Sequence, residues 1–81
     1  MDVQIDLVRD NPEVGRLYHL TCSTGRTFEV GLQYRHEGSI RLVHGWIDGE
    51  DHNKPGKQWR DPEEALRDIA DYIREVCERE S

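Results

Sequence analysis

The last fifth of the chain most constrains the fold, because it is typical of one amphipathic helix. Asp61 can cap the free backbone amides, Pro62 suits the first helical position, and Glu64 can bond back to the cap. Apolar residues then recur at every third or fourth position, which places them in one stripe: Leu66, Ile69, Ile73, Val76 and Cys77. We therefore expect a helix over residues 61–80 whose apolar stripe covers a sheet.

The chain before this helix alternates between apolar and polar residues, as strands with one buried face do. Turn residues divide it into segments, and a length of 81 residues allows one domain. The predicted fold is α+β: a single domain with an antiparallel four-stranded meander and one C-terminal helix across its apolar face. The strands are expected at about residues 3–8, 16–22, 26–35 and 39–48, followed by a loop over 49–60 and the helix over 61–80.

Two hairpin loops are predicted to set the strand register. Residues 23–25 and 36–38 each form a three-residue loop with glycine last, where a left-handed conformation is needed. This register puts nearly every apolar side chain on one face, with His44 and Trp46 among them. The expected partners are Tyr18 with Val30, Leu20 with Phe28, Phe28 with Trp46, Leu32 with Leu42, and Tyr34 with Ile40.

The opposite face of the predicted sheet carries a small apolar row. Leu17, Gly31 and Val43 lie side by side in this register, and Ile47 lies further along. Glycine inside a strand often marks a close approach by another backbone. One interpretation is an ordinary scatter of exposed apolar residues or a strand kink; the other is a contact patch for a second copy or a partner.

The connection over residues 49–60 holds a basic and aromatic cluster made of Lys54, Lys57, Trp59 and Arg60. We expect Trp59 to lie under the start of the helix as a lid on the core. The alternative is a nucleic-acid contact in which Trp59 stacks on a base. The net charge of −6 counts against nucleic acid as a partner.

Most of the negative charge belongs to the helix. Five carboxylates at steps of three and four share the stripe opposite Leu66: Glu64, Asp68, Asp71, Glu75 and Glu78. Such a stripe is either a solvated face that keeps the chain soluble or an acidic docking surface for a basic groove.

The residue pattern does not favour catalysis or metal binding. His19 and Cys22 are three apart on a strand, so they point to opposite faces and do not chelate one ion readily. His19 is expected opposite Glu29, where the two could act as a base and its orienting group or simply as a surface pair. We expect no enzyme, no metal and no cofactor. Cys22 and Cys77 are expected to be buried free thiols at opposite ends of the helix.

These observations favour a small acidic, non-enzymatic binding protein, an inhibitor or adaptor that docks on a basic surface of a larger protein. Phage-encoded inhibitors of host systems that bind nucleic acid have this general character, although no residue motif carries the analogy. A homodimeric structural or regulatory module, assembled through the outer sheet face, is the first alternative; nucleic-acid binding through residues 52–60 is the second. No apolar run approaches the roughly 18 residues of a membrane span, and we expect a cytoplasmic protein.

Overall fold

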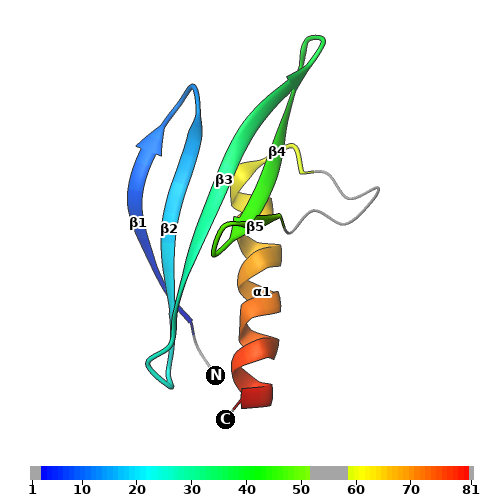
Figure 1. The fold of residues 1–81 in the computed structure, drawn as a ribbon. Coiled ribbons are helices and arrows are strands. Elements are labelled where there is room, and N and C mark those ends of the chain that lie inside the picture. The colour runs from blue at the N-terminus through cyan, green and yellow to red at the C-terminus, as the bar shows by residue number, and fades with distance from the viewer. Residues whose placement is uncertain (1–2, 52–58, 81) are drawn as a thin grey trace.

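The chain folds into an antiparallel sheet with one helix packed on one of its faces (Figure 1). The computed structural model describes residues 3–51 and 59–80. Strands neighbour one another in chain order, so the sheet is a meander. The expected α+β fold is therefore confirmed, with one short strand added. The elements are β1 (Val3–Asn11), β2 (Gly15–Cys22), β3 (Thr27–Glu37), β4 (Ile40–Ile47), β5 (Glu50–Asp51) and α1 (Pro62–Glu80).

The β2–β3 hairpin has the predicted register. Gly25 adopts a φ of 94°, and its amide donates a hydrogen bond to the Cys22 carbonyl at 2.9 Å. Tyr18 is opposite Val30, and Leu20 is opposite Phe28. These four side chains are buried in the core cluster, which shows that the turn and the apolar alternation agree here.

The predicted register of the β3–β4 hairpin is wrong by three residues. Its loop has two residues, Gly38 and Ser39, and Gly38 supplies the positive φ of 64°. Tyr34 consequently lies opposite Val43 instead of Ile40. Because three is odd, the side chains of β4 face the side opposite to the predicted one. The residues on the helix side are Val43, Gly45 and Ile47, and those on the outer side are Leu42, His44 and Trp46.

Gly45 allows the helix to approach β4 closely. A β-carbon at this position would lie 2.6 Å from Cδ1 of Ile69 and 3.4 Å from the ring of Trp59. Val43 beside it is fully buried in the same cluster. The helix and the sheet thus approach each other at a residue that has no side chain.

After β4 the chain turns back along that strand. Asp48 and Gly49 have φ values of 51° and 84°, which fits a tight two-residue hairpin turn into β5. Trp59 then pairs with Val43, whose amide donates to the Trp59 carbonyl at 2.7 Å. The helix therefore begins beside the middle of β4 and not at the strand's end.

The start and the buried stripe of α1 are as predicted. An Asp61 carboxylate oxygen accepts a hydrogen bond from the Glu63 amide at 2.9 Å, which caps the helix. The buried side is small and aliphatic, and each fully buried Ile contributes about 1.5–3 kcal/mol. Its buried residues are Ala65, Ile69, Ala70, Ile73 and Cys77, with Leu66 and Val76 partly buried against the cluster.

Cys22 and Cys77 form a disulfide, with 6.4 Å between their Cα atoms and 55 residues between them in the chain. The expectation of free thiols at opposite ends is wrong. Because α1 starts beside Val43, its last turns reach the end of the sheet where β2 ends (Figure 1). Arg26 and Glu80 form an ion pair at the same end.

β1 is less buried than its alternation predicts. Val3 is 9% exposed, but Ile5 and Leu7 on the same side are 41% and 55% exposed. The pairing with β2 shifts between Leu7 and Arg9, where Val8 is the extra residue of a bulge. β1 therefore joins the sheet without being covered by the helix along most of its length.

Candidate protein-binding surfaces

The acidic face of α1 is exposed, as the sequence predicts, but its middle is used within the fold. Glu64, Asp71, Glu75 and Glu78 are exposed. Asp68 is half-buried and accepts a hydrogen bond from the Trp59 indole Nε1 at 2.8 Å. Four of the five predicted carboxylates therefore face outward, and the fifth, Asp68, is directed towards Trp59.

Asp71 has a partner on its own helix. The Arg74 guanidinium donates a hydrogen bond to an Asp71 carboxylate oxygen at 2.6 Å, in the i,i+3 arrangement that joins neighbouring turns. The Asp71 side chain is 63% exposed and the Arg74 side chain 39%, so solvent screens the pair and it contributes little to stability. Glu64 and Glu75 lie on the same stripe on either side of this pair.

Of the basic and aromatic cluster, the structure describes Trp59 and Arg60. Trp59 is 2% exposed and belongs to the hydrophobic core, which confirms its expected place under the start of the helix. Its buried ring is not open to a base, so the alternative interpretation of Trp59 as a stacking residue does not hold. Arg60 is exposed, whereas Lys54 and Lys57 lie outside the described residues.

The outer apolar row differs in composition from the prediction. Val43 is fully buried and Ile47 is partly buried against the core, so neither belongs to the outer face. Leu17 and Gly31 are opposite each other as expected, and the third member of the row is Trp46, opposite Gly31 on its other side. The reversal of β4 exchanges one aliphatic residue for an indole ring.

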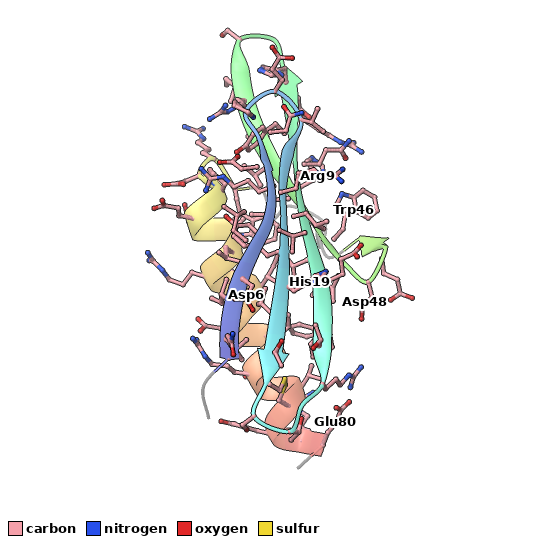
Figure 2. The ribbon with its side chains drawn as sticks, turned by 90° about the vertical axis from the view of Figure 1, so that its left-hand side faces the viewer. Asp6, Arg9, His19, Trp46, Asp48 and Glu80 are labelled. Atoms are coloured by element: carbon pink, nitrogen blue, oxygen red, sulfur yellow. A yellow bond between two sulfur atoms is a disulfide. The ribbon has the colours of Figure 1, made fainter. Side chains whose placement is uncertain are left out.

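A shallow depression of about 460 Å³ lies over this row. Leu17, Gly31 and Trp46 line it together with Arg9 from β1. Figure 2 shows Arg9 and Trp46 close together on the side of the sheet away from the helix. This part of the outer face joins an aromatic ring to a guanidinium, which suits a contact with a flat or an acidic group.

Lower on the same face, His19 lies opposite Glu29 as predicted, with its Nε2 atom 3.9 Å from a carboxylate oxygen. The His19 and Glu29 side chains are 45% and 59% exposed, which is the setting of an ordinary cross-strand pair. Asp6 of β1 lies on the other side of His19. Among residues 3–51 and 59–80, no cluster of His, Cys, Asp and Glu could hold a metal ion.

The helix-side face holds a second basic group, Arg16. Its guanidinium donates to the Tyr18 hydroxyl at 3.3 Å and lies 3.4 Å from an Asp10 carboxylate oxygen. The hydrogen bond to Tyr18 is the main cause that raises the pKa of Arg16 above its ordinary value, against the opposing effect of burial. Arg16 therefore stays charged and ties the end of β1 to β2.

The edge strand β1 presents apolar surface that sequence reasoning did not expect to be exposed. Ile5, Leu7 and Val8 are between 41% and 55% exposed. A further depression of about 240 Å³ lies between Ile5 and the β1 side of the helix, where Leu66 and Ala70 line it. Alternation along β1 correctly gives the side that Ile5 and Leu7 take, but it does not show how far a single helix reaches across the sheet.

Comparison with known proteins adds no relative: no family model matches the chain, and no curated protein or solved structure matches it significantly. In the part of the chain that the structure describes, no helix is long and apolar enough to cross a membrane.

Proposed function

We propose that this chain is a non-enzymatic binding protein, an inhibitor or adaptor that docks on a basic surface of a larger protein through the outward face of α1. The observation that carries the proposal is the exposure of Glu64, Asp71, Glu75 and Glu78 along a helix whose opposite side is anchored in the core. A rigidly held row of charges loses little conformational freedom on binding, and it steers a basic partner towards it.

The anchoring of the helix strengthens this reading. The disulfide holds its last turns, the Asp61 cap holds its first turn, and the bond between Trp59 and Asp68 fixes the first half. Charges displayed in this way keep a fixed spacing, as a docking surface requires. Asp68 is a structural residue in this account and not a contact.

The test is charge reversal on the helix. The double variant Glu64→Lys/Glu75→Lys should lose the basic protein that the wild type retains in quantitative affinity capture from native cells. The matched control is Glu13→Lys/Glu37→Lys, which changes the net charge equally at two exposed positions near the hairpin loops. Equal retention by both variants and the wild type would reject the proposal, provided that circular dichroism shows all three folded.

A cytoplasmic location is part of this proposal, and the disulfide makes it measurable. The cytosol keeps thiols reduced, whereas oxidising compartments preserve disulfides. Trapping free thiols in intact cells and then separating the protein under non-reducing conditions reports the state of Cys22 and Cys77. Alkylation of both residues fits the cytoplasm, and full protection contradicts it.

The homodimer alternative assumed a contact patch on the outer sheet face that included Val43 and Ile47. These two residues lie on the core side of the sheet, so that patch does not form. Self-association is better supported at the edge of the sheet than on its outer face.

A further inference from the structure

The outer edge of β1 is the part of the described sheet with the clearest capacity for pairing. β1 is the first strand in the order β1-β2-β3-β4-β5, so β2 is its only described neighbour. Its nine residues include the exposed Ile5, Leu7 and Val8. A long edge strand with apolar side chains is a template for another strand, which hydrogen-bonds to its unpaired backbone groups.

Two opposite charges on β1 are placed for pairing with a copy of the same strand. Asp6 is opposite His19 and Arg9 is opposite Leu17, and these two β2 residues are two apart, so Asp6 and Arg9 face the same side. Both side chains are exposed, and their pairing with β2 places them on the outer face of the sheet. When two such strands run antiparallel, Asp6 of each copy can lie opposite Arg9 of the other.

The bulge selects this partner over an ordinary strand. Asp6 and Arg9 are three residues apart but share a face, because the register shifts between Leu7 and Arg9. A regular strand, in which residues of one face are two apart, would fall out of step with β1 beyond the bulge. A second copy carries the same bulge, and with Asp6 opposite Arg9 the two bulges lie opposite each other.

We propose that two copies of the chain associate by antiparallel pairing of their β1 strands about a two-fold axis, with Asp6 of each copy opposite Arg9 of the other. The axis makes the interface isologous, so the charge pair occurs twice. Leu7 of one copy lies opposite Val8 of the other in this register, and Gln4 opposite Asn11. The two sheets become one continuous sheet.

The helix flank beside β1 is compatible with a second copy. The charged residues around the depression next to Ile5 are Arg67, Arg74 and Glu63, while the acidic stripe points away from the sheet. Pairing at β1 therefore covers apolar surface without bringing the two acidic stripes face to face. The proposal is independent of the docking role of that stripe, which stays exposed in the dimer.

Sedimentation equilibrium of the full chain with exchanged charges tests the register. Asp6→Arg and Arg9→Asp should each weaken the dimer about tenfold, because each turns both cross-strand attractions into repulsions. The double variant Asp6→Arg/Arg9→Asp restores both pairs in reversed order and should return the dissociation constant to the wild-type value. Glu37→Arg, which changes the charge as Asp6→Arg does but at the far end of β3, should leave the dissociation constant unchanged.

Leu7→Lys tests whether β1 is the interface, independently of the register. A charged side chain at this position disrupts pairing of the β1 strands in any alignment. A wild-type chain that is monomeric at about 1 mM, where even weak complexes form, would overturn the proposal. A dimer that Leu7→Lys leaves intact would also overturn it. A dimer that Leu7→Lys breaks but the double charge exchange fails to restore would overturn the Asp6–Arg9 register.

Discussion

The two edges of the sheet are built differently. At the β4 edge, Trp59 pairs with the strand, its ring lies beside Gly45, and its indole bonds to Asp68 of the helix. At the β1 edge, Ile5 and Leu7 project from the helix side of the sheet and remain about half exposed. One edge is closed by backbone, ring and helix together, and the other is left open.

The width of a helix explains this difference. An α-helix with its side chains is about 10–12 Å across, and neighbouring strands are about 4.8 Å apart, so one helix covers two or three strands. Gly45 brings α1 close to β4, which leaves most of β1 uncovered by the helix. In a domain of this size, the side to which the single helix is drawn decides where apolar surface remains for a partner.

Removing the ring that closes the β4 edge should have the largest effect. Trp59→Ala leaves a cavity under the helix and takes the donor from Asp68, so the free energy of unfolding should fall by about 3–5 kcal/mol. Urea denaturation measures it. The matched control is Trp46→Ala on the outer face, where the ring is only half-buried and the loss should be much smaller. Equal losses would mean that the two tryptophans do not differ as their burial implies.

Two glycines of the sheet allow a comparison in which the expected loss of stability is smaller. Gly45→Ala places a methyl group against Ile69 and should cost about 1–3 kcal/mol by overpacking. Gly31→Ala has only the Cβ atom of Trp46 within 4 Å, at 3.9 Å, and should change stability by about 0.5 kcal/mol or less. Thermal unfolding of the two variants, which place the same methyl group on opposite faces of the sheet, should rank them in this order.

The smallest effect is expected at the open edge. Leu7→Ala should lower the stability of the isolated chain by about 0.5 kcal/mol, because half of the side chain is already in water. Leu20→Ala, the buried control on β2, should cost about 2–5 kcal/mol. A cost for Leu7→Ala that grows with protein concentration would indicate that the open edge is covered by association.

The β2–β3 hairpin was predictable from the sequence and the β3–β4 hairpin was not. In the first, the apolar residues of β2 and β3 favour one alignment, and in it Gly25 ends a three-residue loop. In the second, Gly38 suits either the last position of a longer loop or the first position of a shorter one. β4 is apolar on both sides, so alternation cannot choose between them.

The same reversal limited prediction of the candidate surfaces. The acidic helix face followed from periodicity alone, because one helical period fixes both its buried and its exposed side. Asp68 is the exception, since its bond to Trp59 depends on how the chain returns along β4. The signal for that return is Asp48-Gly49, a dipeptide typical of two-residue hairpins, which marks β5. Trp46 lies on the outer face because of the register change between β3 and β4, which no local sequence pattern indicates.

The disulfide between Cys22 and Cys77 makes a closed covalent ring of everything from the end of β2 to the last turns of α1. β1, and all of β2 except Cys22, lie in the N-terminal segment outside that ring. β1 can separate from β2, or exchange with the β1 strand of another molecule, while the ring keeps β3, β4 and the helix together. Reduction would open the ring, so that its residues are no longer held more firmly than the N-terminal segment.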